Sequence, residues 1–286
     1  MAKITTVEKA LDAVRKDGGA LGDVPEKLKT AEVCLEAIKY GGSLIDVPWE
    51  LKTEELCLEA MKQGKDYTTL MGVPENIKTA KVCLEAVKQN GGALKFLPKE
   101  LMEKPPKEFG AACLKAVKED GKNLAYVPDS LKTAEMCLES VKQTGQLVYV
   151  PEKLRTAEIC LIAVKQSGNM LGDVPEKLRT PELCLEAVKQ NGQALDKVPE
   201  NLKTKELCLE AVKRSSYAFG SVPEKLKTKE LCLEAVKLDG RALEEVPEKL
   251  KTAELCLEAV KQDEKALEYV PKEIRDEVRR RLKSGK

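Results

Sequence analysis

The hydrophobic positions of this chain follow a short pattern that is repeated along most of its length. In the stretch 180–203, apolar side chains at helical spacing cover roughly 200° of a helical wheel: Leu183, Cys184, Leu185, Ala187 and Val188. Glutamate, lysine and glutamine fill the remainder of the wheel. Because so wide an apolar arc cannot be buried on a single surface, the pattern predicts a helix packed between two neighbours, as in a stack of repeats.

The two ends of this predicted helix carry their own signals. Thr180 is a candidate N-cap, Pro181 suits the first helical position, and Glu182 places negative charge at the positive end of the helix dipole. Gly192 is the expected stop, since a left-handed residue after a helix favours glycine. The same role is predicted once per repeat for Gly18, Gly121, Gly145, Gly168 and Gly240.

The second half of the repeat, residues 193–203, is predicted to form shorter helical pieces. Pro199 pushes Val198 out of the α conformation, which indicates a short helix, a break, and a proline-started turn ending at Leu202, partly 3-10 in character. The alternative is a leucine-rich repeat, whose units run about 20 to 29 residues. That motif needs an asparagine close behind a Leu-x-Leu strand, whereas residues 186–190 favour a helix.

The whole pattern recurs with a period close to 24 residues. A Val-Pro pair, once Leu-Pro, begins at residues 24, 47, 73, 97, 127, 150, 174, 198, 222, 246 and 270. The cysteines keep the same spacing, and nine of the ten follow a threonine by four residues: Cys34, Cys57, Cys83, Cys113, Cys137, Cys160, Cys184, Cys208, Cys232 and Cys256. Such periodicity predicts one helical-repeat domain over residues 1–286.

Three segments depart from the pattern. Residues 1–25 are predicted to be an N-terminal cap repeat, because Lys9 and Ala10 stand on the stacking face where later repeats carry leucine and cysteine. Residues 271–286 are predicted to be a C-terminal cap helix, whose arginines at 279–281 complement the helix dipole or, alternatively, attract an anion. Residues 102–112 make one repeat six residues longer than usual and are predicted to be an insertion loop, with Phe109 in the usual place of threonine.

Composition narrows the function classes. The chain has 49 basic and 48 acidic residues and a net charge of +1, so there is no electrostatic reason to expect nucleic acid or a membrane surface as partner. Met1–Val14 contains no apolar run with a cleavage site, and no stretch approaches the ~18 apolar residues of a membrane helix. Ten cysteines without a secretion signal predict free thiols and a cytoplasmic location.

The cysteines are the obvious candidates for chemistry. Packed helices lie ~8–10 Å apart, whereas a disulfide needs Cα atoms within ~7 Å, so regular stacking predicts unbridged thiols that pack as small apolar side chains. No Cys-x-x-Cys pair exists and histidine is absent, which argues against zinc. The carboxylates have repeat-wide explanations, at helix starts or one turn from a lysine. We therefore expect no catalytic residues, metal, cofactor or small-molecule substrate.

The residue before each Val-Pro or Leu-Pro varies between repeats. Three consecutive repeats carry an aromatic residue there, Phe96, Tyr126 and Tyr149. If this position faces solvent, the rings form a patch, and clustered aromatics are the usual anchors of protein interfaces. Trp49, the only tryptophan, could extend that patch. The alternative is that the rings cover the edge of the core.

Repeats such as Val174–Gly192, with the core LEAVKQNG at residues 185–192, resemble a bacterial repeat family known only as a domain of unknown function, DUF4116. The resemblance covers nearly the whole chain; it implies a bacterial source and a repeat role, but no activity. The alternation of a longer and a shorter helix is also similar to variant leucine-rich repeats, which form right-handed superhelices. Together these features predict an all-α, right-handed α-solenoid of about eleven 24-residue repeats.

A non-catalytic protein-interaction scaffold with an unidentified protein partner is the function that this pattern favours, because repeat stacks offer long continuous surfaces. The alternative is a protein that binds nucleic acid or another polyanion through lysines such as Lys177 and Lys189. That function needs lysines gathered on one side of the stack, whereas the sequence indicates alternating charges. An enzyme ranks third and would need a reactive thiol site.

Overall fold

The computed structural model describes residues 4–64 and 67–284. Those residues form α-helices and short 3-10 helices (η) with no β-strand among them, so the all-helical prediction is confirmed and the described chain lacks the strand of a leucine-rich repeat. The chain divides into two compact units, unit 1 over residues 1–144 and unit 2 over residues 145–286. Each unit is described by itself.

Unit 1 alternates α-helices with 3-10 helices. Its α-helices are α1 (Val7–Lys16), α2 (Ala31–Lys39), α3 (Glu54–Gln63), α4 (Ala80–Gln89), α5 (Lys99–Glu103), α6 (Phe109–Glu119) and α7 (Ala134–Thr144). Its 3-10 helices are η1 (Gly18–Asp23), η2 (Glu26–Leu28), η3 (Leu44–Asp46), η4 (Trp49–Leu51), η5 (Tyr67–Gly72), η6 (Glu75–Ile77), η7 (Gly91–Phe96) and η8 (Gly121–Tyr126).

Unit 2 follows the same order with greater regularity. Its α-helices are α8 (Ala157–Gln166), α9 (Pro181–Gln190), α10 (Lys205–Arg214), α11 (Lys229–Leu238), α12 (Ala253–Gln262) and α13 (Lys272–Ser284). Its 3-10 helices are η9 (Glu152–Leu154), η10 (Gly168–Asp173), η11 (Glu176–Leu178), η12 (Gly192–Lys197), η13 (Glu200–Leu202), η14 (Ser216–Ser221), η15 (Glu224–Leu226), η16 (Gly240–Glu245), η17 (Glu248–Leu250) and η18 (Glu264–Tyr269).

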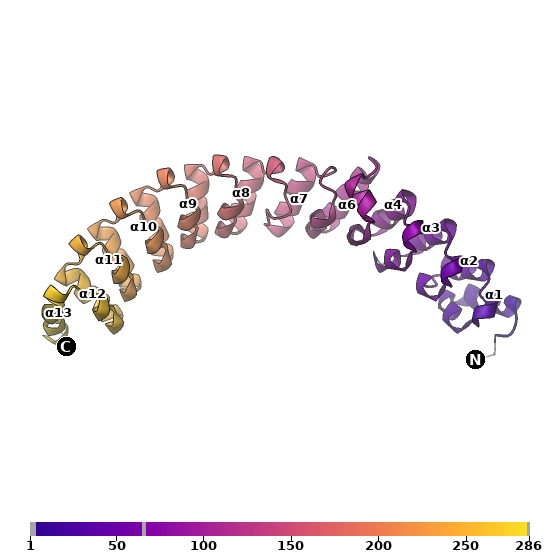
Figure 1. Cartoon of the computed structure of the whole chain (residues 1–286), viewed down its shortest axis with the longest axis horizontal. Helices are drawn as coiled ribbons and strands as arrows, with labels where there is room; N and C mark the ends of the chain where they lie inside the picture. Colours follow the sequence, from indigo (N-terminus) through magenta and orange to yellow (C-terminus); the bar gives the residue numbers. More distant parts are fainter. Residues whose placement is uncertain (1–3, 65–66, 285–286) are drawn as a thin grey trace. The chain divides into compact units, whose positions relative to one another are not determined.

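Within each unit, consecutive α-helices pack against each other, and the longer 3-10 helices form a second row beside them (Figure 1). The α9 repeat shows how the apolar arc is used. Leu183, Cys184, Ala187 and Val188 are buried, whereas Leu185 remains 37% exposed at the edge of the arc. The helix therefore packs between two neighbours, as its wide arc predicts.

The start of α9 is built as the sequence indicates. The Thr180 hydroxyl accepts a hydrogen bond from the backbone N–H of Leu183 at 3.3 Å, and Pro181 is the first helical residue. After the helix, Asn191 is extended, and its side-chain oxygen accepts from the backbone N–H of Gln193 at 3.0 Å. Asn191 therefore caps the following 3-10 helix η12, so that the chain passes from one helix to the next through a single extended residue.

The predicted role of the glycines as left-handed helix stops is wrong at all but one position. In the described chain a positive φ occurs only at Gly41 and Gly145. Gly192 opens η12 instead, and a Cβ placed there would lie 2.3 Å from the carbonyl oxygen of Ala211 in the next repeat. Gly168 and Gly240 stand in the same relation to α9 and α12, at 2.3 and 2.2 Å. Glycine is required here because one repeat approaches the backbone of the next.

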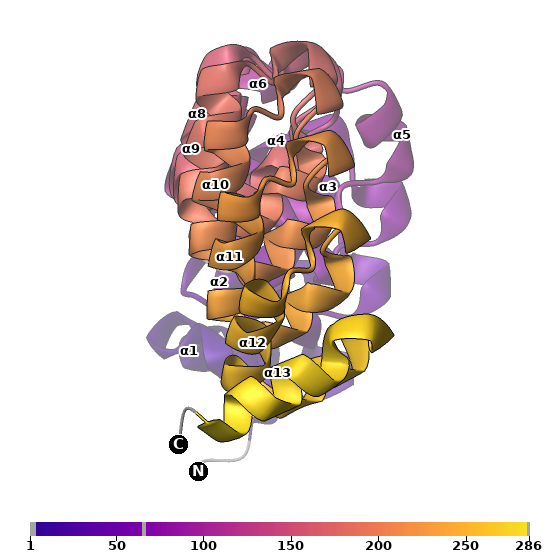
Figure 2. The ribbon, with the colours of Figure 1, turned by 90° about the vertical axis from the view of Figure 1, so that its left-hand side faces the viewer.

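The two terminal segments and the longer repeat are the parts of the chain that depart from the regular pattern. Lys9 is exposed on α1, as expected of a cap, while Ala10 is buried. Figure 2 shows α13 lying across the end of unit 2 beside α12, with Val278 buried. The predicted insertion loop is shorter than expected, because α5 ends at Glu103 and α6 begins at Phe109, which is buried. Only residues 104–108 connect the two helices.

Candidate interaction surface

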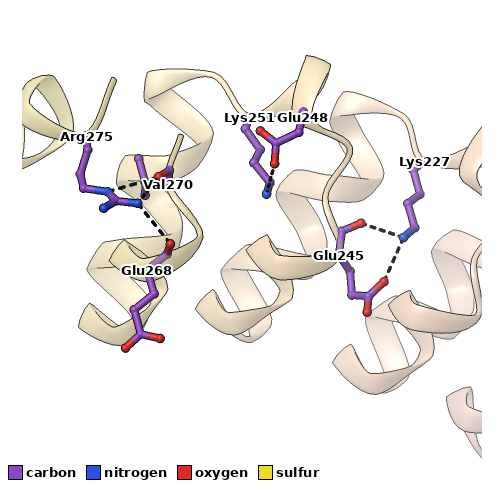
Figure 3. Close-up of polar contacts among 7 residues, drawn as sticks. All are labelled: Lys227, Glu245, Glu248, Lys251, Glu268, Val270 and Arg275. Atoms are coloured by element: carbon purple, nitrogen blue, oxygen red, sulfur yellow. Dashed lines mark hydrogen bonds and ion pairs between the residues drawn. The ribbon is translucent and has the colours of Figure 1, made fainter. Parts of the chain in front are cut away.

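A basic residue stands directly before the capping threonine in nearly every repeat, and its side chain points inward. Lys227 is representative: its side chain is 6% exposed, and its Nζ donates to the carbonyl oxygen of Glu245 at 2.7 Å (Figure 3). We name the basic residues that stand five positions after the valine of a Val-Pro pair the cation column: Lys29, Lys52, Lys78, Lys132, Arg155, Arg179, Lys203, Lys227, Lys251 and Arg275. Six of them donate to a carbonyl of the next repeat: Lys29, Lys52, Arg155, Arg179, Lys203 and Lys227.

The acceptor is the same backbone group in successive repeats. Lys29 Nζ donates to the carbonyl of Asp46 at 3.0 Å, Arg179 Nη1 to that of Lys197 at 2.7 Å, and Lys203 Nζ to that of Ser221 at 3.0 Å. Each acceptor directly precedes a Val-Pro pair. A carboxylate three residues before most of these lysines, such as Glu248 at 2.8 Å from Lys251 in Figure 3, partly neutralises the buried ammonium.

This bonding fixes the backbone where the sequence varies most. We name the two residues before each Val-Pro or Leu-Pro the variable column. In six repeats the carbonyl of the second residue accepts a hydrogen bond from the cation column of the previous repeat, so its side chain can change without loss of that bond. Neighbouring members meet across repeats: a Cβ on Gly172 would lie 3.6 Å from Lys197 Cγ, and Lys95 Nζ lies 5.2 Å from the centre of the Tyr126 ring.

The predicted binding residues occupy different environments. Tyr126 is 37% exposed and Phe96 is half-buried, on the neighbouring helices η8 and η7 of unit 1. Tyr149 is half-buried in unit 2, so a row of the three rings stays a prediction. Trp49 is 60% exposed but belongs to η4, after the proline, with Lys52 Nζ 5.0 Å from its ring centre. It does not extend the variable column.

Sequence reasoning missed the most exposed apolar members of the variable column. Ile45 is 81% exposed, Met71 is 59% exposed and Val148 is 63% exposed. They lie two residues before the Val-Pro pair, one position from the residues that were considered. Ile45 and Met71 belong to the neighbouring helices η3 and η5, which contact each other in unit 1. Comparing both positions between repeats would have found them.

The profile of a family described as Domain of unknown function (DUF4116) matches four tandem segments, residues 113–155, 135–179, 180–227 and 228–275. The chain belongs to this family. No curated protein and no solved structure matches it. DUF4116 membership confirms the resemblance drawn from the LEAVKQNG core, while a bacterial source and a cytoplasmic location stay predictions.

The cysteines of this DUF4116 chain are held in an environment that suppresses reactivity. All ten are buried, and no disulfide joins them in the structure. Burial raises the pKa of Cys57 to about 11 and that of Cys83 to about 12, despite the opposing charges of Lys52 and Lys78. A thiol is nucleophilic only as the thiolate, so these side chains pack as apolar groups.

The part of the chain that the structure describes holds neither a candidate metal cluster nor a membrane-spanning helix. No group of three or more histidine, cysteine, aspartate or glutamate side chains there is placed to hold a metal ion. Nor does any helix among residues 4–64 and 67–284 combine the length and the apolar character needed to cross a membrane.

Proposed function

We propose that this DUF4116 chain is a non-catalytic protein-interaction scaffold, a right-handed α-solenoid of about eleven repeats whose variable column binds a protein partner in the cytoplasm. One observation carries the proposal. Core positions and inter-repeat hydrogen bonds recur from repeat to repeat, whereas the exposed side chains between them change freely. A stack of repeats without a partner would gain nothing from large apolar side chains exposed in the variable column.

The apolar members of unit 1 are the best anchors. Ile45 and Met71 expose most of their side chains on adjacent 3-10 helices, and Tyr126 adds an exposed ring further along the same unit. Large apolar side chains that a stack leaves exposed are typical of partner-binding patches. We assign the first contact with a partner to Ile45 and Met71.

The test compares the intact chain with a matched pair of variants. Ile45→Ser combined with Met71→Ser removes the exposed anchors, while Leu238→Ser removes an apolar side chain, 52% exposed, that lies at the end of α11 outside the variable column. Each protein is used to capture partners from the source cells, with quantitative mass spectrometry. A partner retained by the wild type and by Leu238→Ser but lost by the double variant supports the scaffold. Equal capture by all three proteins contradicts this assignment.

Binding to nucleic acid or another polyanion is the second candidate function. Lys177 and Lys189 are exposed and available for it. The cation column weakens this candidate, because one basic side chain in nearly every repeat is turned inward to backbone carbonyls and glutamates. The same capture experiment, repeated after nuclease treatment, separates the two functions: a polyanion binder loses its partners, whereas a protein scaffold keeps them.

A further inference from the structure

A cavity of about 400 Å³ opens on unit 2 where the 3-10 row is least regular. Its lining includes Ser216 and Tyr217 of η14, Arg241 and Glu244 of η16, and Tyr269 of η18. The cavity belongs to the same row of 3-10 helices that carries the variable column. It is open to solvent, so a side chain from outside can enter it.

The sequence explains why the row opens at this place. The helices η12 and η16 begin with Gly192 and Gly240, where a Cβ would collide with the next α-helix at 2.3 and 2.2 Å. At the equivalent position η14 has Ser216, which carries a Cβ, and η14 packs less closely on α11 than η12 packs on α10. Phe219 also replaces the usual leucine in this repeat. The cavity thus lies beside local departures from the repeat.

Charges around the cavity are unequal. Arg241 Nε lies 3.4 Å from Asp239 Oδ1 and 3.5 Å from Asp263 Oδ2, so two carboxylates face one guanidinium. Glu245 is paired with Lys227 at 3.4 Å. Among residues 4–64 and 67–284 no basic side chain forms an ion pair with Glu244; it accepts a hydrogen bond from the Tyr269 hydroxyl, and its charge raises the pKa of that hydroxyl. The walls therefore carry more negative than positive charge.

The aromatic side chains complete a site for a cation. Tyr217 is 72% exposed at the cavity and lies near Arg241, and Tyr269 of η18 is hydrogen-bonded to Glu244. The face of an aromatic ring attracts ammonium and guanidinium groups, and a carboxylate adds a charge-assisted hydrogen bond. An anion would instead compete with Asp239 and Asp263 for Arg241.

We propose that this cavity binds the lysine or arginine side chain of an extended segment of the partner protein, between Tyr217 and Glu244. The inference rests on the proposed function, because it assigns a chemistry to one position of the same surface. It goes further by naming a basic residue as the group that is recognised.

The probe is an acetylated, amidated pentapeptide with one central arginine among glycine and serine, and its control carries citrulline, the neutral isostere. Titration of the intact protein followed by NMR amide shifts is expected to give a dissociation constant in the millimolar range for arginine, with shifts confined to η14, η16 and η18. The citrulline peptide should bind at least tenfold more weakly. Equal binding of both peptides, or shifts elsewhere, would overturn the proposal.

Three variants locate the site. Tyr217→Ala and Glu244→Gln should each weaken arginine-peptide binding at least fivefold, and Ser216→Gly should weaken it by restoring the close packing of η14. The controls are Tyr40→Ala, an exposed tyrosine in unit 1, and Glu176→Gln, an exposed glutamate of unit 2 that does not line the cavity; both should bind as the wild type does. Unchanged binding by Tyr217→Ala and Glu244→Gln refutes the site.

The experiments can reject the cavity proposal and the scaffold proposal independently of each other. Loss of captured partner in the Ile45 and Met71 double variant, together with no arginine-peptide binding, rejects only the cavity. Arginine-peptide binding in a chain that captures no partner through Ile45 and Met71 rejects only that anchor. Inorganic phosphate serves as a third ligand: if it displaces nothing and shifts no amide of η16, Arg241 is not an anion site, as the proposal requires.

Discussion

Single residues of the cation column connect one repeat to the next. A buried ammonium is stabilised only where acceptors surround it, and here a backbone carbonyl of the following repeat and a nearby glutamate supply them. Lysine and arginine fill the role interchangeably, as Lys203 and Arg179 show. The sequence displayed this column as a basic residue before each capping threonine, yet its function was hidden because the acceptor is main chain, 18 residues away.

Removing one member of the column should destabilise the stack. Lys203→Met leaves the Ser221 carbonyl without its donor, at a loss of about 1–3 kcal/mol of unfolding free energy. Lys203→Arg should retain most of the stability, because Arg155 and Arg179 make the equivalent bond to the next repeat. Lys205→Met, at an exposed site two residues away, is the control. Urea unfolding of the wild type and the three variants measures the loss of unfolding free energy. Equal midpoints for the wild type and Lys203→Met would show that the hydrogen bond contributes nothing to stability.

The thiols make a second prediction at this scale. Native protein near neutral pH should react with none of its ten cysteines, and denatured protein with all ten. An unfolded thiol ionises near 9.0, whereas burial raises the pKa of Cys57 to about 11 and that of Cys83 to about 12. Their stabilising contribution is therefore complete below pH 9.0 and lost as the pH rises toward 11 and 12. Unfolding midpoints measured from pH 7 to 11 should be flat and then fall.

Local elements were largely predictable from the sequence, and the exceptions depend on contacts between repeats. Thr180 and Pro181 set the start of α9 through neighbours in sequence, so their roles could be predicted. Gly192 could not be assigned correctly, because glycine serves equally for a left-handed stop and for close approach, and only the position of Ala211 in the next repeat decides between them. The distance to the next repeat decides which role Gly192 has, and the local sequence pattern does not contain that distance.

Substitution of Gly192 separates the two roles. Gly192→Ala should lower the unfolding free energy by about 1–3 kcal/mol, since the added Cβ meets backbone that cannot move aside cheaply. Gly192→Asn should be worse still, whereas a left-handed stop would tolerate asparagine. Gly110→Ala is the control, because no atom lies within 4 Å of its added Cβ and alanine favours the helix α6. Calorimetric melting temperatures should therefore be highest for Gly110→Ala, lower for Gly192→Ala and lowest for Gly192→Asn.

Over the whole molecule, the sequence located the variable positions but not the side chains that protrude there. The period of the Val-Pro pairs marks the variable column in every repeat, and Tyr126 was found in this way. Which member protrudes depends on how each 3-10 helix meets its neighbour, so the exposure of Ile45 and the cavity beside Ser216 required coordinates. A chain of equal repeats thus acquires distinct sites through small local departures.

Tyr126 decides whether the aromatic members of that column bind a partner or complete the core. Its ring is partly exposed and lies beside Lys95, a position that suits an interface anchor with a cation close by. Tyr126→Ala should therefore weaken partner affinity by about 2 kcal/mol, with helicity and melting temperature unchanged. Tyr40→Ala, which removes an exposed tyrosine outside the variable column, should change neither quantity.

Calorimetric titration and thermal melting of the same samples measure both effects of Tyr126→Ala. A lowered melting temperature with unchanged affinity would mean that the ring covers the edge of the core, and the binding surface would then lie with Ile45, Met71 and the unit 2 cavity.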